Sequence, residues 1–301
     1  MHTERTDDIG FESESHSFGI VISTLGRVGP LEFLLTSLVC QSHKNFKVAL
    51  CVQGNYAEVD NLLARRVDFA ALDIQVVTSN RGVSLGRNRA AGLLADTDYL
   101  VFPNDTTTYG HDLLTLLDRK VAGFQAGTMT VEDSFGPKFA LPASGSLDRY
   151  NVWKVISPGL VMKSSVFFVL GGFNEQLGTG ASSPWQSGEE TDLLLRFLDL
   201  EGVAFQWMAA LKVSGSPDSA GLSTPARRRK LRGYGRGLGR ILATHNYSRL
   251  RRWKIILAGF AFGLRHPQEF TILDGLWVGL GRLEGTTGHI FDRSAISAVS
   301  Q

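Results

Sequence analysis

Two segments of the sequence hold residue types suited to binding a phosphorylated ligand. The first runs from Asn80 to Gly82 and enters a predicted helix that bears Arg87. Free backbone N–H groups at a helix start, together with an arginine, form a phosphate-binding arrangement. The second, Pro103–Thr107, places the carboxylate of Asp105 where a divalent metal could bridge that phosphate. Each segment alone also fits a plainer interpretation, because the second can be a surface turn and Arg87 can pair with an acid on the helix surface.

Two more loops belong to the same pattern, and all four loops follow or adjoin apolar runs that predict strands. Ser23–Arg27 contains small residues that let a ligand approach the backbone, and Gln53–Asn55 follows the second run. The predicted strands cover residues 19–23, 46–52, 74–78 and 98–102, and the predicted helices cover residues 30–41, 56–66, 84–95 and 111–117. Strands that alternate with helices predict a mostly parallel sheet with helices on both faces. The ligand of such a sheet lies beyond the carboxyl ends of the strands, so the four loops should meet there.

The second half of the sheet region is less regular and ends in an acidic helix. Two apolar runs between residues 121 and 163 predict further strands, and a loop rich in Gly and Ser, Gly171–Gly188, leads into the predicted helix 189–202. The first turn of that helix holds three acids, which are Glu189, Glu190 and Asp192. Acids in a first turn stabilise a helix through its dipole, and that role alone explains their position.

Composition and charge describe a folded protein with an asymmetric charge. The chain has 301 residues, of which 43% are hydrophobic and 20% charged, and a net charge of +2. Residues 1–17 are polar and acidic and are predicted to be a disordered tail. Between Ser219 and Gln268 there are twelve Lys or Arg and no Asp or Glu, so the rest of the chain is acidic. A segment of this charge favours a polyanion, whether phosphates, anionic lipid or nucleic acid.

The C-terminal region, residues 223–301, is predicted to be helical, basic and amphipathic. Its two apolar stretches, around Trp253 and Trp277, are bounded by arginine and are much shorter than the roughly 20 residues that cross a bilayer. Such stretches suit helices that lie in a membrane interface, where Trp and Arg sit at the headgroup level. A pair of helices packed into a core is the alternative.

Taken together, the order and spacing of these motifs resemble the family-2 inverting glycosyltransferases of the GT-A fold. The opening IVISTLGRVGPLEFLLTSLVCQSHKNFKVALCVQGN looks like that family's first strand, loop, helix and strand. NRGVSLGRNRAAGLLADTDYLVFPNDTTTY resembles its Gly-x-Ser-x-x-Arg-Asn helix and metal loop, and GGFNEQLG and GEETDLLLR resemble its acceptor-side segment and acidic helix start. The resemblance implies a GT-A (Rossmann-like), mostly parallel mixed sheet flanked by helices. The catalytic domain would cover residues 18–222, followed by a helical basic C-terminal extension.

The resemblance also implies roles for individual residues in binding a nucleotide-sugar. Thr24 would contact the nucleotide, and Gln53 falls where an acidic residue usually reads the base. Arg87 would meet the base or the diphosphate, beside Asn104. Asp105 would hold a divalent cation, Mn²⁺ or Mg²⁺, bound to the diphosphate. The family's metal loop usually has two or three aspartates, whereas this loop has one, and one carboxylate with phosphate oxygens and water can hold magnesium.

On the acceptor side, the resemblance makes Glu190, in the pair with Glu189, the general base. One carboxylate that deprotonates the acceptor hydroxyl is sufficient for inverting transfer, without a covalent nucleophile. The helix N-terminus is expected to stabilise the Glu190 anion and keep it ionised at neutral pH. Trp185 and Asp192 are the predicted acceptor contacts, although Trp185 fits equally well as a residue that packs its loop onto the domain.

These inferences predict a metal-dependent glycosyltransferase that acts on a lipid-linked or polysaccharide-precursor acceptor in cell-envelope synthesis. We expect it in the cytoplasm, peripherally bound to the anionic inner face of the cell membrane, with no nucleic-acid partner. One rival prediction is a nucleotidyltransferase, although the segment Ser23–Gly29 has only one arginine where that class usually has a basic, Gly-rich loop. The other is a catalytically weakened protein that binds nucleotide-sugars, membranes or nucleic acid.

Overall fold

A computed structural model describes residues 15–217, 221–267 and 269–291. The strands are β1 (Phe18–Thr24), β2 (Phe46–Val52), β3 (Ile74–Thr78), β4 (Tyr99–Val101), β5 (Thr108–Tyr109), β6 (Ala126–Asp133), β7 (Gly136–Pro137), β8 (Leu160–Lys163) and β9 (Phe205–Ser214). The helices are α1 (Val28–Val39), α2 (Tyr56–Arg65), α3 (Val83–Ala91), α4 (Leu113–Val121), α5 (Ser164–Val169), α6 (Glu189–Phe197), α7 (Thr224–Thr244), α8 (Arg249–Phe260), α9 (Phe262–Arg265) and α10 (Ile272–Thr287). Short 3₁₀ turns occur at Val67–Ala71, Gly92–Leu94, Val152–Lys154 and Ser157–Gly159.

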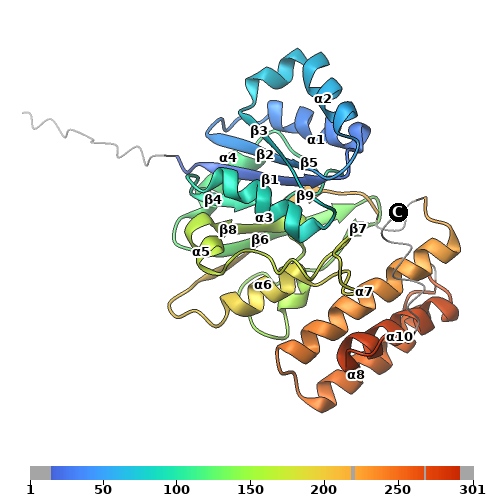
Figure 1. The fold of residues 1–301 in the computed structure, drawn as a ribbon. Helices are drawn as coiled ribbons and strands as arrows, with labels where there is room; N and C mark the ends of the chain where they lie inside the picture. The colour runs from blue at the N-terminus through green and yellow to red at the C-terminus, as the bar shows by residue number, and fades with distance from the viewer. Residues whose placement is uncertain (1–14, 218–220, 268, 292–301) are drawn as a thin grey trace, which may run out of the picture.

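One mixed sheet forms the centre of the molecule (Figure 1). Its strand order is β3-β2-β1-β4-β8-β6-β9-β5, with β7 paired to β6. The pairs β3–β2, β2–β1 and β1–β4 are parallel, as is β6–β9, whereas β8 runs antiparallel to both β4 and β6. The carboxyl ends of β1, β2, β3 and β4 therefore meet at one edge, and this is the mostly parallel mixed sheet that the sequence predicts.

Both faces of the sheet are buried, which explains why its strands are nearly continuous apolar runs. Side chains of β4 alternate between two cores: Val101 belongs to the core beneath α1, α2 and α4, whereas Leu100 belongs to the core shared with α3 and α6. The parallel strands form a layer that is packed on both faces, and this layer holds the loops at its carboxyl edge in fixed positions.

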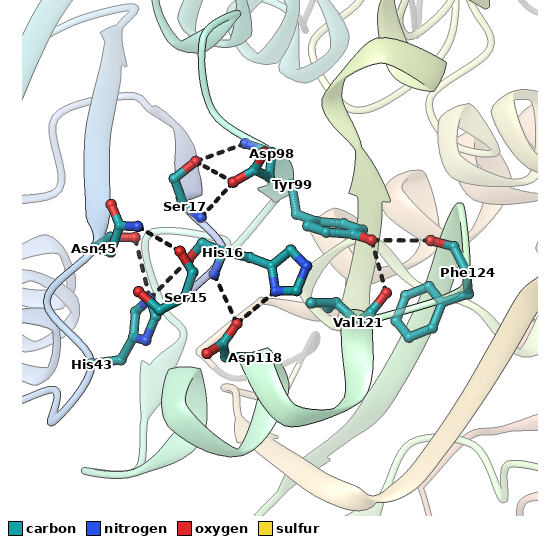
Figure 2. A network of polar contacts seen from close by, with 10 residues as sticks. All are labelled: Ser15, His16, Ser17, His43, Asn45, Asp98, Tyr99, Asp118, Val121 and Phe124. Carbon is teal, nitrogen blue, oxygen red and sulfur yellow. Dashed lines mark hydrogen bonds and ion pairs between the residues drawn. The ribbon is translucent and has the colours of Figure 1, made fainter. Parts of the chain in front are cut away.

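Residues 15–17 are bound to the body of the protein (Figure 2). The backbone N–H and the hydroxyl of Ser17 donate to the carboxylate of Asp98, each at 2.7 Å. The backbone N–H of His16 donates to Asp118 at 3.0 Å, and the His16 ring lies 2.8 Å from the same oxygen. The predicted disordered tail is therefore wrong for these three residues, and its other members, residues 1–14, lie outside the described residues.

The basic C-terminal segment completes the second core instead of forming a separate unit. Ile241 and Leu242 of α7 are fully buried in the core that also contains residues of α6. The backbones of α7 and α10 approach so closely that a Cβ on Gly281 would lie 2.2 Å from the carbonyl oxygen of Arg232. A chain cut at the predicted boundary after residue 222 would lose part of the second core.

Two buried acids of α10 neutralise four of the arginines that make this segment basic. Glu284 accepts hydrogen bonds from Arg232 at 2.9 Å and from Arg236 at 2.7 Å. Asp274 is bound in the same way by Arg227 at 2.8 Å and Arg228 at 3.1 Å. Burial alone would raise the pKa of Glu284, but the two guanidinium groups outweigh it and hold that pKa below its ordinary value. The expectation that the whole segment needs an external polyanion is therefore wrong for these four bases.

Glu284→Gln should destabilise the protein strongly, because it leaves two buried guanidinium groups with no carboxylate. Breaking a buried pair in this way costs about 3–5 kcal/mol. We expect the melting temperature in thermal unfolding to fall by roughly 5–15 °C. Glu269→Gln, at an exposed acid of the same region, is the control and should change it little. Equal melting temperatures for the two variants would show that Glu284 does not hold α7 and α10 together.

Candidate functional site

The carboxyl ends of β1 and β4 meet through a bridge between Ser23 and Asn104. This bridge brings two of the four predicted loops into contact. The hydroxyl of Thr24 donates to Asp105 Oδ2 at 2.7 Å, and both residues are almost fully buried. Asp105 is therefore fixed at the floor of the sheet edge by a neighbour from the adjacent strand.

Arg27 binds the other side of the Asp105 carboxylate. Its Nε lies 3.3 Å from Asp105 Oδ2, and its Nη2 makes a close contact with Oδ1. The Arg27 side chain is 58% exposed, so it covers the buried acid and still faces solvent. A role for Arg27 is missing from the sequence-based predictions, although a signal for it exists, because Arg27 is the single arginine of the loop Ser23–Arg27.

Arg87 connects the other elements of the edge. It lies in α3, is buried, and donates to Asn104 Oδ1 at 2.9 Å, Glu189 Oε1 at 3.1 Å and the Ser157 hydroxyl at 2.9 Å. One guanidinium thus ties the loop after β4 to the start of α6. Its Nε has no hydrogen-bond partner among the described residues. Arg87 does pair with an acid, but not with one on the surface of its own helix, because Glu189 is buried and belongs to α6. The contact of Arg87 with a base or a diphosphate stays a prediction.

Gln53 holds two of the loops together. Its Nε2 lies within hydrogen-bond distance of the Ser79 hydroxyl and of the carbonyl oxygens of Asn80 and Gly82, at 2.8–2.9 Å. These contacts fix the backbone that enters α3. Gln53 therefore lies at the edge of the site, where its hydrogen bonds hold the backbone before α3 in place. Its predicted part in reading a base stays a prediction.

The start of α6 is shaped by the approach of α7. Gly188, the residue before the helix, has φ of 91°, and a Cβ there would lie 2.8 Å from Ile241 of α7. Only glycine fits both conditions. This geometry places Glu189 against Arg87 and leaves Glu190 beside Glu189 at the first helical turn.

Glu190 does not have the low pKa that its position on a helix N-terminus led us to expect. Desolvation of its carboxyl and repulsion by Glu189 raise its pKa to about 8. A helix terminus contributes about 0.3–1 kcal/mol, which is less than one pKa unit and cannot offset these two effects. The prediction that Glu190 is ionised at neutral pH is therefore wrong. A carboxyl with a pKa near the working pH is nonetheless well suited to general-base catalysis.

The two predicted acceptor residues have partners within the protein. Asp192 Oδ1 lies 2.9 Å from Nε2 of His245, at the end of α7, and its Oδ2 accepts from Arg196 at 2.9 Å. Trp185 is half-buried, and the guanidinium of Arg240 lies 5.3 Å from its ring centre. These contacts agree with structural roles that join α7 to α6 and to the loop before it. The acceptor roles of Trp185 and Asp192 stay predictions.

A cavity of about 420 Å³ adjoins the Asp105 loop between the start of α1 and the end of β9. Its wall combines the ring of Phe33 with the hydroxyl groups of Thr106, Thr108 and Ser214. Another cavity, of about 230 Å³, lies beside His245 at the far end of α6, away from Glu190. Space for a ligand therefore exists next to the loop that carries Asp105.

Comparison with known proteins gives no match to a family model and none to a curated protein. Among solved structures, S. aureus TarS 1–349 in complex with UDP matches with a TM-score of 0.56 at 13% identity, covering 94% of this chain and 90% of that one. The same protein in complex with UDP-GlcNAc matches with a TM-score of 0.54 at 13% identity, covering 92% and 93%. GalNAc-T7 with UDP, GalNAc and Mn²⁺ matches with a TM-score of 0.58 at 11% identity, covering 82% of this chain.

These likenesses show the fold of the chain, which is the GT-A fold of glycosyltransferases that the sequence predicts. The chain spans about half of the longer structures it matches, 45% of a longer TarS chain and 51% of GalNAc-T7. Among the described residues, none of the helices combines the length and the apolar character needed to cross a bilayer.

Proposed function

We propose that this chain is an inverting glycosyltransferase that moves a sugar from a nucleotide-sugar donor to an acceptor hydroxyl. The observation that supports it is a continuous series of contacts at the carboxyl edge of a GT-A sheet. The series runs from Asp105 through Asn104 and Arg87 to Glu189, and Glu190 follows next in the chain. It places cationic groups, which suit a diphosphate, beside a carboxyl that can take a proton.

In the proposed reaction the acceptor oxygen attacks the anomeric carbon of the donor sugar. The bond between that carbon and the diphosphate oxygen breaks, and its electron pair leaves with the nucleoside diphosphate. Glu190 takes the proton of the acceptor hydroxyl. Arg87, held by Glu189, orients the diphosphate through charge-assisted hydrogen bonds. One displacement by one base inverts the configuration at the anomeric carbon.

The divalent cation that the resemblance implies does not fit the residues of the Asp105 loop. Asp105 supplies the single carboxylate there, and both of its oxygens are bound by Thr24 and Arg27. Across the described residues, no three His, Cys, Asp or Glu side chains are grouped to hold a metal ion. No step of the proposed reaction therefore depends on a metal.

The direct test is release of UDP or GDP from a panel of UDP- and GDP-sugars, with water as the slow acceptor. Release of a nucleoside diphosphate together with a free sugar supports the proposal. Binding of a nucleotide-sugar with no release would favour the weakened binding protein. Consumption of a nucleoside triphosphate and a sugar phosphate, with release of pyrophosphate, would favour a nucleotidyltransferase.

The rate of this release should rise with pH toward about 8 and then level off. A raised carboxyl pKa means that Glu190 is protonated at lower pH and unable to accept a proton, so activity is lost as the pH falls. Well below that pKa, the kcat/KM for donor cleavage should fall about tenfold per pH unit, as for one deprotonation. Initial rates from about pH 5.5 to 9.5 measure this. A flat profile would contradict the assignment of Glu190 as the base.

We also propose that the acceptor is a lipid-linked or polysaccharide-precursor sugar at the inner face of the cell membrane. The support is a set of exposed apolar side chains on the C-terminal helices, which we call the helical apolar surface. It consists of Leu250, Trp253, Leu257, Leu264, Ile272, Leu273 and Leu276. Exposed apolar patches of this kind mark interaction sites.

A further inference from the structure

Two guanidinium groups bind the two residues of the loop where the resemblance places a metal ion. Arg27 binds Asp105 from the β1 side of the loop, and Arg87 donates to Asn104 Oδ1 at 2.9 Å from the α3 side. The two side chains come from different elements, separated by two strands and two helices in the sequence. Positive charge therefore converges on this loop from both sides.

These contacts oppose binding of a divalent cation in two ways. The oxygen ligands that Mg²⁺ or Mn²⁺ would need are already hydrogen-bonded, to Thr24 and Arg27 at Asp105 and to Arg87 at Asn104. A cation bound there would also lie next to two guanidinium groups, whose positive charge repels it. Loss of Arg27 from Asp105 would be required before a metal could bind this carboxylate.

From this arrangement we propose that Arg27 binds the diphosphate of the donor and, with Arg87, takes the place of the divalent cation. The inference rests on the proposed glycosyl transfer. When the bond between the anomeric carbon and the diphosphate oxygen breaks, the electron pair stays on that oxygen. The two guanidinium groups stabilise the added charge, and no proton moves in this part of the reaction.

The exposure of Arg27 is what makes it suited to this role. Its side chain is 58% exposed while that of Asp105 is 4% exposed, so the arginine faces the incoming ligand and the acid stays behind it. An arginine presents a planar set of N–H donors that matches two phosphate oxygens. Asp105 then acts as a positioning residue, which holds Arg27 with help from Thr24.

Binding of UDP and GDP, measured by calorimetry with EDTA and with MnCl₂, tests this inference in the full chain. For the wild type we expect the Kd of whichever nucleotide binds to change by less than about threefold between the two conditions. Arg27→Ala should weaken binding in EDTA by about 10–100-fold, the usual worth of a charged hydrogen bond. Arg27→Lys should recover part of the loss, because it keeps the charge without the planar donors. Arg65→Ala removes an equally exposed arginine paired with Glu32 and should have no effect.

Asp105→Asn distinguishes a site in which Arg27 replaces the metal from a site in which Asp105 is a metal ligand, because the two predict opposite results for this variant. If Arg27 replaces the metal, this variant removes a negative charge near the diphosphate while its amide oxygen can still accept a hydrogen bond from Arg27, so UDP binding in EDTA should be unchanged or tighter. If Asp105 is a metal ligand, the variant should lose manganese-dependent binding. The electron paramagnetic resonance signal of Mn²⁺ gives a readout that is independent of activity, and wild-type protein with UDP should bind no more Mn²⁺ than UDP alone.

Nucleotide binding that requires Mn²⁺, or Arg27→Ala binding as tightly as the wild type in EDTA, would overturn the inference and leave the proposed transferase intact. Absence of UDP and GDP binding from every variant under both conditions would overturn the proposed function itself, and the inference with it. Circular dichroism of each variant shows whether a loss of binding reflects unfolding.

Discussion

Glu190→Gln should lower the rate of donor cleavage and transfer by roughly 10²–10⁴-fold, the usual worth of general-base catalysis. Glutamine keeps the shape of the side chain and cannot accept the proton of the attacking hydroxyl. The affinity for UDP or GDP should barely change, because Arg87 is held by the neighbouring Glu189. Initial rates of nucleoside diphosphate release, measured beside nucleotide Kd values, separate these two effects.

The matched variant Glu189→Gln tests the division of roles between the two acids. Because repulsion by Glu189 helps to raise the pKa of Glu190, removing that charge should shift the pH–rate profile to lower pH. Glu201→Gln, at an exposed acid after α6, should behave as the wild type. Near-normal turnover of Glu190→Gln together with loss of turnover in Glu189→Gln would exchange the two assignments.

Thermal unfolding supplies the control for structural damage in Glu190→Gln. The raised pKa means that the folded protein binds the Glu190 proton more tightly than the unfolded chain does. The stability that this proton provides is therefore fully present below the ordinary pKa of 4.5 and is lost progressively as the pH rises from there to about 8. Glutamine does not ionise, so Glu190→Gln should be at least as stable as the wild type at low pH and increasingly more stable as the pH rises toward about 8. A less stable variant would mean that lost activity reflects lost structure.

Local sequence patterns predict most of this fold because its sheet is buried on both faces. The runs that predict β1, β2, β3 and β4 lie within about one residue of the strands, since continuous apolar segments bounded by turns leave few alternatives. The strand β9 was missed, although its partial alternation of buried and exposed residues was a usable signal. The helix predicted at residues 84–95 corresponds to α3 and the 3₁₀ turn Gly92–Leu94 that follows it.

Local sequence patterns do not predict the contacts that form the site. Arg87 and Glu189 are each recognisable from their local sequence, but their contact joins residues 102 positions apart. Contacts that form only in the folded chain also explain why the basic C-terminal segment was wrongly expected to need an external polyanion for all of its charge. A stretch of bases without acids looked unpaired because its partners, Asp274 and Glu284, lie just beyond it in the sequence and pack against it only in the folded chain.

Exposed basic side chains lie on the same helices as the helical apolar surface, and this favours an anionic lipid surface as the occupant. Arg249, Lys254 and Arg265 are exposed on α8 and α9 among its side chains, while Glu269 is the exposed acid nearby. In α10, Gly281 and Gly285 lie against α7 and Gly275 lies against α8. The exposed residues of α10 therefore lie away from α7, and those of α8 lie away from α10, because Gly259 of α8 packs against Gly279.

Leu250, Trp253 and Leu257 form the α8 part of this surface, since they are 66%, 56% and 62% exposed and lie on one face of the helix. Replacing all three by serine should remove about 3–5 kcal/mol of membrane binding, because full burial of each large apolar side chain contributes about 1.5–3 kcal/mol and only the part now exposed can still be buried. That change lowers partitioning onto anionic vesicles by roughly 10²–10⁴-fold. Replacing Phe135, Val67 and Val169, which are exposed outside the C-terminal helices, by serine is the matched control and should leave binding unchanged.

Co-sedimentation of the full chain with vesicles of phosphatidylserine and phosphatidylcholine measures this effect, beside vesicles of phosphatidylcholine alone. Binding should be much weaker to the neutral vesicles and should decrease with salt, because each exposed base contributes about 1 kcal/mol near an anionic surface. Duplex DNA, measured in parallel, should be retained weakly, since the apolar side chains have no partner on it. Light scattering tests the remaining occupant, because a second copy of the chain on this surface would give a dimer in the wild type and a monomer in the serine variant. Such a dimer, or full-length protein that ignores anionic vesicles at low salt, would contradict the membrane assignment and leave the transferase site unaffected.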